Sequence, residues 1–168
     1  MGTKRVGWAR IRSLINENNN QMKFKSAQVV HVNNTATTLT AAQSGATVFW
    51  THGSAHNITL PAATAGMHFK IVITAGSNHA QNIAADSGDG FYGRVVVATT
   101  NAADKVAMQA VAKGSAKDYI KLQQNTTTKG GSTGDVINLW CLEDGYWNVD
   151  ALLHCTGGNP GSIATLAD

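Results

Sequence analysis

Residues 57–73 read NITLPAATAGMHFKIVI, and this stretch decides the fold. Its second half places four apolar residues in alternation with three others: Met67, Phe69, Ile71 and Ile73 on one side, and His68, Lys70 and Val72 on the other. A period of two is the signature of a β-strand with one buried face. The first half is a short extended run that stops at Pro61, because proline cannot donate to a sheet. The small residues at 62–66 then predict a tight corner between two strands.

Runs of β-branched and aromatic residues recur through the rest of the chain. They are AQVVHV (27–32), TVFWTH (47–52), RVVVA (94–98), KVAMQAVA (105–112), DYIKLQ (118–123) and the paired run DVINLWCLEDGYWNVDALL (135–153). The last run predicts a hairpin, since Gly145 can take the positive φ of a tight turn, with Trp140 and Trp147 facing each other across it. About eight to ten strands predict an all-β fold: a single antiparallel sandwich or a barrel-like, jelly-roll-like domain.

Length and composition are consistent with one β-rich domain. A chain of 168 residues can bury a core, and only 14% of its residues are charged. No apolar run approaches the roughly 20 residues that span a bilayer, and the first residues contain no apolar segment typical of a secretory signal. Cys141 and Cys155 are too few for a disulfide framework, so we expect two reduced thiols in a protein made in a cytoplasm.

The net charge of +3 is unevenly distributed. Six of the 13 basic residues precede residue 26, where Glu17 is the only acid; they are Lys4, Arg5, Arg10, Arg12, Lys23 and Lys25. The remaining chain has seven basic and nine acidic residues, a net charge of −2. We therefore predict a basic N-terminal arm at 1–25 and a slightly acidic body at 26–168.

The arm also carries an apolar stripe with approximately helical spacing. A short amphipathic helix needs a packing partner because helix nucleation is costly. We expect the arm to bind a protein partner through Lys4, Arg5, Val6, Trp8, Arg10, Ile11, Arg12, Leu14 and Ile15. A solvated terminus explains the pattern equally well. The basic residues suit an acidic protein surface, and we do not expect nucleic acid as the main partner.

Four short motifs suggest chemistry, and each has a simpler structural interpretation. His52 and His56 have a possible metal-ligand spacing, but Gly53 and Ser54 between them indicate a loop. The run DSGDG (86–90) lacks the alternation of a calcium loop, and KGGSTGD (129–135) lacks the Lys-Ser/Thr that ends a phosphate loop. His154 and Cys155 are adjacent on an extended chain and should point apart. We predict no catalytic, cofactor or metal site.

Residues 38–76, TLTAAQSGATVFWTHGSAHNITLPAATAGMHFKIVITAG, resemble a pattern found in small structural proteins of tailed bacteriophages. In that pattern a segment LTAA-x-SG leads to a strand and then to ITLP-x-A-x-AG-x-x-F-x-I. The closing run VINLWCLEDGYWNV is similar to the late hairpin of these proteins, and MGTKRVGWARIRSLI resembles the N-termini of marine phage virion proteins, including those of cyanophages. The resemblance implies a virion structural protein, and it transfers no catalytic residue to this chain.

Three functional classes follow from these observations. The first is a capsid decoration (cement) protein that binds the major capsid protein on the surface of the virion after synthesis in the host cytoplasm. The second is a tail-fibre or receptor-binding module, or another tail-associated protein, that contacts host glycans through exposed Trp, Asn and His. The third is an enzyme, for which no acid–base constellation is present. A fibre predicts long repeats, which are absent, so we favour decoration. The resemblance also implies a homotrimer.

Overall fold

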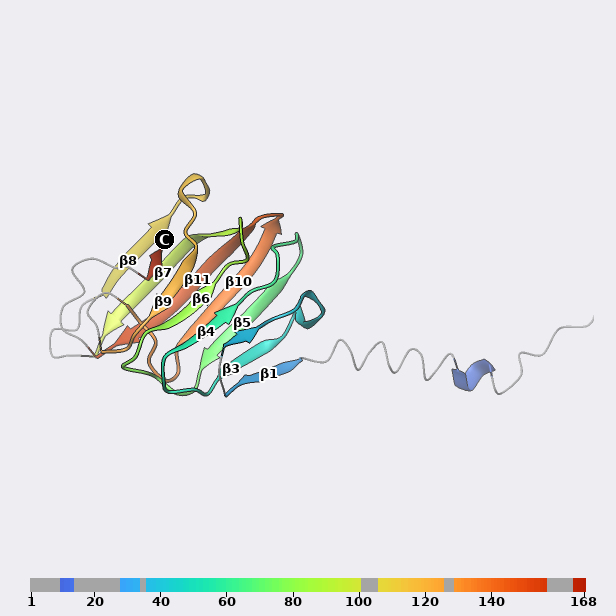
Figure 1. Cartoon of the computed structure of the whole chain (residues 1–168), viewed down its shortest axis with the longest axis horizontal. Helices are drawn as coiled ribbons and strands as arrows, with labels where there is room; N and C mark the ends of the chain where they lie inside the picture. The colour runs from blue at the N-terminus through green and yellow to red at the C-terminus, as the bar shows by residue number, and fades with distance from the viewer. Residues whose placement is uncertain (1–9, 14–27, 34–35, 101–105, 126–128, 157–164) are drawn as a thin grey trace, which may run out of the picture.

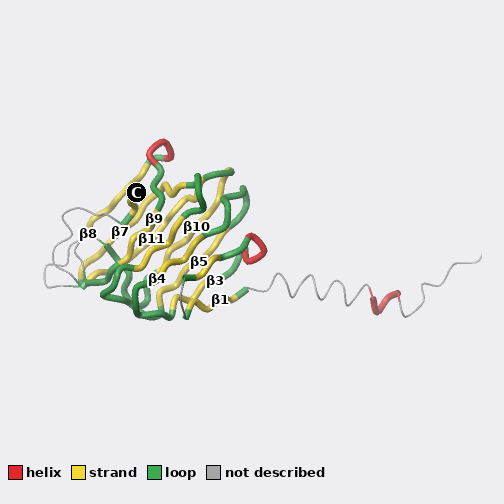
Figure 2. Tube along the Cα trace, viewed as in Figure 1, coloured by secondary structure: helices red, strands yellow, loops and turns green. Residues whose placement is uncertain are grey.

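The computed structural model describes residues 10–13, 28–33, 36–100, 106–125, 129–156 and 165–168. Two β-sheets pack face to face as a sandwich around one hydrophobic core (Figures 1 and 2). A short helical turn lies at residues 10–13. The all-β character predicted from the sequence is confirmed, and of the two predicted forms the sandwich is the one observed.

The larger sheet contains seven strands. Their spatial order is β1 (Val29–Val32), β3 (Thr47–Trp50), β5 (His68–Ile73), β10 (Val136–Glu143), β11 (Tyr146–Cys155), β7 (Gly90–Thr99) and β8 (Val106–Val111). The smaller sheet has the order β12 (Leu166–Ala167), β9 (Tyr119–Leu122), β6 (Gln81–Ala84), β4 (His56–Thr59) and β2 (Thr37–Thr38). Two 3₁₀ turns, η1 (Ala41–Gln43) and η2 (Lys113–Ser115), lie in the connections.

The prediction of a purely antiparallel fold is wrong. The first six strands alternate between the sheets along the chain, so that β1, β3 and β5 are parallel in one sheet and β2, β4 and β6 are parallel in the other. Two successive strands of one sheet are connected through a strand of the other sheet. The chain therefore comes back to the first sheet from the same end, and the two strands run in the same direction. The pair β7 and β11 is also parallel, whereas β5–β10, β10–β11, β7–β8, β6–β9 and β9–β12 are antiparallel.

The segment 57–73 forms the predicted corner. Strand β4 ends at Thr59, the Leu60 N–H donates to the Ala84 carbonyl, and Pro61 follows where no further donor is needed. The chain then crosses from the smaller sheet to the larger one and restarts as β5. Gly66 has φ +92°, a conformation that favours glycine, and its N–H donates to the Cys141 carbonyl.

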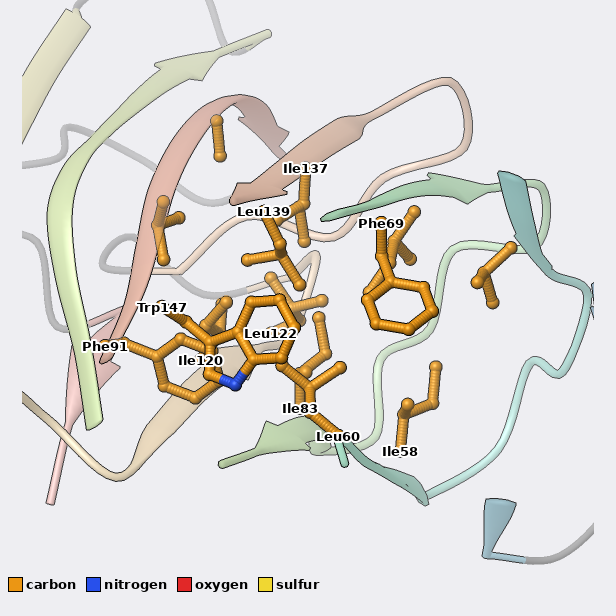
Figure 3. Packing of buried hydrophobic residues seen from close by; sticks show 14 of the residues in the cluster. Ile58, Leu60, Phe69, Ile83, Phe91, Ile120, Leu122, Ile137, Leu139 and Trp147 are labelled. Atoms are coloured by element: carbon orange, nitrogen blue, oxygen red, sulfur yellow. The ribbon is translucent and has the colours of Figure 1, made fainter. Parts of the chain in front are cut away.

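Alternation along the strands produces the core (Figure 3). The predicted inward set of β5 is confirmed, since Phe69, Ile71 and Ile73 are fully or almost fully buried. Trp147 from β11 lies against Phe69 with ring centroids 5.7 Å apart. Isoleucines and leucines from both sheets fill the space around these rings, so burial of apolar area from every central strand joins the two layers.

The predicted hairpin is present, and Gly145 has φ +83° in its turn. Trp140 and Trp147 lie on paired strands, but they do not meet. Trp140 is opposite Asn148, and Trp147 is opposite Phe91 on β7. Trp147 therefore points into the core, whereas Trp140 points to the outer surface. The sequence did not predict β2, β6 or β12, because these strands are short and β6 is the polar-looking run QNIA.

Replacing Gly93 with alanine tests the close packing of β7 on β11. Gly93 has φ +118°, and a Cβ there would lie 2.3 Å from the carbonyl oxygen of Val149. We expect Gly93→Ala to lower the free energy of unfolding by about 2 kcal/mol or more, measured by urea denaturation. The matched control is Gly114→Ala, where a Cβ meets nothing within 4 Å. Equal stability of the two variants would contradict this account.

Candidate functional site

The outer face of the seven-stranded sheet, which points away from the smaller sheet, carries the most distinctive surface among the described residues. The strand register aligns its side chains in rows that cross the sheet. We name three of them by their character: the apolar row, the polar row and the aromatic row.

The apolar row crosses all seven strands. Its members are His31, Phe49, Val72, Val136, Leu152, Val96 and Met108, in spatial order. His31 stacks on Phe49 with ring centroids 5.6 Å apart. Leu152 is 58% exposed and Met108 is 65% exposed. An aligned apolar band on a surface is typical of a place where a partner binds.

The polar row is the neighbouring one, with Lys70, Asn138, Asp150, Arg94 and Ala110 in order. The Arg94 Nε donates to Asp150 Oδ1 at 2.8 Å. This hydrogen bond, followed by the charge of Asp150, raises the pKa of the Arg94 guanidinium. Both side chains are substantially exposed, so the pair contributes little to stability and its polar atoms face outward.

The aromatic row comprises His68, Trp140, Asn148 and Tyr92. A hollow of about 450 Å³ lies between this row and the polar row, lined by Gly93, Arg94, Ala110, Trp140, Asn148, Val149 and Asp150. A second hollow of about 240 Å³ lies between the polar and apolar rows and shares Arg94 and Asp150 with the first. The Arg94–Asp150 ion pair therefore lies between two hollows. Trp140 and Asn148 line the first, and the apolar side chains of Val96, Met108 and Leu152 line the second.

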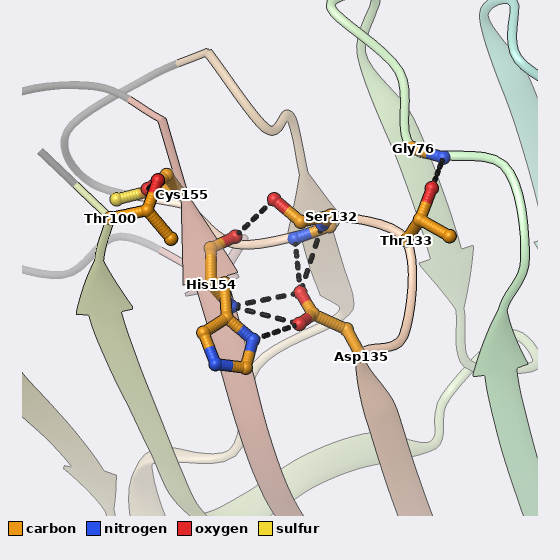
Figure 4. A network of polar contacts seen from close by, with 8 residues as sticks. Gly76, Thr100, Ser132, Thr133, Asp135, His154 and Cys155 are labelled. Atoms are coloured by element: carbon orange, nitrogen blue, oxygen red, sulfur yellow. Dashed lines mark hydrogen bonds and ion pairs between the residues drawn. The ribbon is translucent and has the colours of Figure 1, made fainter.

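Asp135 forms the most connected polar network of the described residues (Figure 4). Its side chain is fully buried and accepts hydrogen bonds from the backbone N–H groups of Gly131, Ser132 and His154. His154 Nδ1 lies 2.7 Å from Asp135 Oδ1. Ser132 Oγ donates to the carbonyl of His154 and not to its ring, so these residues do not form a nucleophile relay. The network fastens the glycine-rich loop to the end of β11.

The same network explains the loop 129–135, which superficially resembles a phosphate loop. Its N–H groups at Gly131 and Ser132 converge on an anion, but that anion is the protein's own Asp135 carboxylate. Asp89, in the DSGDG run, likewise accepts a hydrogen bond from the Ala63 N–H at 2.6 Å. Both motifs therefore have structural roles in the described body.

The neighbours His154 and Cys155 point in opposite directions, as predicted from the alternation of a strand. Cys155 is fully buried, whereas the side chain of His154 is partly exposed.

His52 and His56 come together, with ring centroids 5.1 Å apart. His56 begins β4, is buried beside Trp50, and has its Nε2 3.5 Å from the Thr37 hydroxyl. Burial, and next the charge of His52, lower the pKa of His56. Within the ranges that the structure describes, no three His, Cys, Asp or Glu residues are grouped closely enough to hold a metal ion.

Most of the predicted arm residues lie outside the described residues: Lys4, Arg5, Val6, Trp8, Leu14 and Ile15. Arg10, Ile11 and Arg12 belong to the helical turn at 10–13, and all four side chains of this turn are exposed. The residues of the outer face were not predicted as a site, because the rows form only when distant strands pair.

Cys141 and Cys155 are both buried and are not joined in a disulfide. Burial raises the pKa of the Cys141 thiol, whose Sγ donates to the Glu143 carbonyl.

No helix among the described residues is long and apolar enough to cross a membrane. Comparisons with protein-family models, with curated proteins and with solved structures found no match to this chain.

The lowered pKa of His56 predicts that acid destabilises the fold. The unfolded chain binds a proton at the ordinary pKa of histidine, whereas the folded protein resists it, so stability present above that pKa is lost as pH falls. Thermal unfolding between about pH 7.5 and about pH 5.5 should show a steeper loss for the wild type than for His56→Gln. The variant His79→Gln controls for loss of an imidazole at an exposed position. Identical slopes for the wild type and His56→Gln would show that His56 is not responsible.

Proposed function

We propose that this chain is a capsid decoration protein of a tailed bacteriophage, seated on the head shell and held there by its N-terminal arm. The ordered resemblance of residues 38–76, of the closing hairpin and of the N-terminus supports the virion assignment. A sandwich body with a basic arm is a suitable form for such a role, because the body covers a surface while the arm reaches a neighbouring subunit.

The observation that carries the proposal is the exposure of the arm's helical turn. Ile11 is 37% exposed in a turn in which Arg10 and Arg12 flank it, and all four residues of the turn are exposed. An amphipathic segment of this kind gains stability by packing on a partner. The partner that we propose is the major capsid protein, with an acidic surface that complements the arm.

We further propose that three copies assemble on the shell. The apolar row offers a surface for contact between copies, since Leu152 and Met108 would lose their exposure to water there. Three arms on one trimer would bind the shell with higher avidity than a single arm.

Deleting residues 1–25 should abolish binding to head shells while leaving the body folded. The expected result is loss of co-sedimentation with shells of the phage that encodes the chain, with an unchanged far-ultraviolet circular dichroism spectrum of β type. The double variant Arg10→Glu/Arg12→Glu should weaken binding, because it lowers the net charge of residues 1–25 from +5 to +1. Lys121→Glu/Lys129→Glu makes the same charge change on the body and should bind as the wild type does. Wild-type occupancy by the deletion variant would refute anchoring by the arm.

Light scattering tests the trimer. Each chain has a mass of 17.6 kDa, and we expect a particle of three times that mass in solution or on the shell. The variant Leu152→Asp/Met108→Asp should dissociate it, because two charges would be buried at the contact. Val29→Asp, at an exposed position on β1 outside the apolar row, is the control. A monomer both at high micromolar concentration and on the shell would exclude the trimer.

A further inference from the structure

We propose that the hollow beside Trp140 binds a neutral carbohydrate. This function is additional to shell binding and uses different residues from those of the arm and the apolar row. The hollow has a volume of about 450 Å³, enough for one to two sugar rings, and it lies on the outer face of the sandwich.

One wall of the hollow is an aromatic platform. Trp140 is 39% exposed, whereas Trp50 and Trp147 are fully buried, so it is the surface tryptophan of the described part of the chain. An exposed indole is costly to leave in water, and its flat apolar face complements the C–H face of a pyranose ring. The hollow is therefore built around the kind of side chain that a sugar stacks on.

The opposite wall supplies paired hydrogen-bonding groups. The hydrogen bond between Arg94 and Asp150 joins Nε to Oδ1 and does not use the terminal nitrogens of the guanidinium or Oδ2 of the carboxylate, and the two side chains are 66% and 41% exposed. A donor and an acceptor held side by side match two adjacent hydroxyl groups, each of which both donates and accepts. Asn148, with an amide that has both functions, lies between this pair and Trp140.

The opposite charges of Arg94 and Asp150 favour an uncharged ligand in the hollow over an anion. Asp150 neutralises Arg94, so a phosphate or carboxylate would gain little attraction there and would face the carboxylate oxygen. A protein side chain is better accommodated by the apolar row, where Leu152 and Met108 lie beyond the ion pair. An uncharged ligand with one apolar face and several hydroxyl groups satisfies both walls of the hollow. This combination points to a neutral hexose.

The base of the hollow keeps space open for the ring. Gly93 has no side chain, Val149 points its side chain into the core, and Ala110 contributes only a methyl group on the edge strand β8. Of these three positions, Ala110 is the exposed one from which a larger side chain would occupy the depression. Ala110→Leu therefore provides a way to block the site without removing a polar group or the platform.

The test is titration of the full-length protein with three neutral oligosaccharides, cellotriose, maltotriose and N,N′,N″-triacetylchitotriose, followed by tryptophan fluorescence and by saturation-transfer NMR. We expect a saturable signal with at least one of the three. Trp140→Ala should reduce the affinity at least tenfold, and Ala110→Leu and Asp150→Asn should also reduce it. Trp140→Tyr retains an aromatic ring and should preserve much of the binding. Leu142→Ala removes an exposed apolar side chain from the same strand outside the hollow and is the control.

Two results would overturn the proposal: no saturable signal from the wild type with any of the three oligosaccharides, or undiminished binding by Trp140→Ala. The site is separable from the proposed shell binding. Trp140→Ala should still co-sediment with shells, and the variant lacking residues 1–25 should still bind the oligosaccharide. If either shell binding or oligosaccharide binding is not observed, the other can still be measured with the same protein.

Discussion

Two of the crossings between the sheets interrupt backbone hydrogen bonding, and at both of them carboxylates accept the backbone N–H groups of the connecting chain. At the corner between β4 and β5, Asp89 accepts from the Ala63 N–H and Asp144 accepts from the Ala65 N–H. At the loop before β10, Asp135 accepts three backbone N–H groups and contacts the His154 ring. An unpaired buried N–H would cost about 1–3 kcal/mol, so the buried residues Ala63 and Gly131 depend on such acceptors for their N–H groups. The same need explains why acidic residues in glycine-rich runs are not evidence of a metal or phosphate site here.

The sequence predicted what depends on local pattern. The alternation in 67–73 correctly identified the inward face of β5, Pro61 marked the end of β4, and Gly145 marked the hairpin turn. It did not predict strand direction, because an alternating strand has the same pattern whether its neighbour is parallel or antiparallel. The outer face was missed for the same reason. Arg94 and Asp150 are 56 residues apart in sequence, and only the register of β7 on β11 brings them together. The arm's residues were identified by charge and spacing, and their role remains a proposal.

The outer face combines three kinds of surface within one sheet. The apolar row suits contact with another protein chain, the ion pair of Arg94 and Asp150 forms a boundary, and Trp140 begins a region of mixed polarity. Separation into rows follows from the two-residue period of the strands, since neighbouring outward positions lie on successive rows. One sheet face thereby offers separate surfaces for the two functions that we propose. Substitutions in one row leave the backbone, and hence the other row, in place.

The winding of the chain has a consequence for how the protein folds. Strands β1, β3 and β5, like β2, β4 and β6, pair with the next strand but one along the chain, whereas β5 also pairs with the distant β10, and the pairing of β7 with β11 places Gly90 opposite Tyr146. The hairpin of β10 and β11 fills the space between β5 and β7, so the larger sheet is two separate pieces until that hairpin inserts. Long-range pairing of this kind slows folding. During synthesis on the ribosome, the edges of β5 and β7 stay open until the hairpin of β10 and β11, which ends at Cys155, has emerged, and for that interval the nascent chain exposes two strand edges that can pair with other chains.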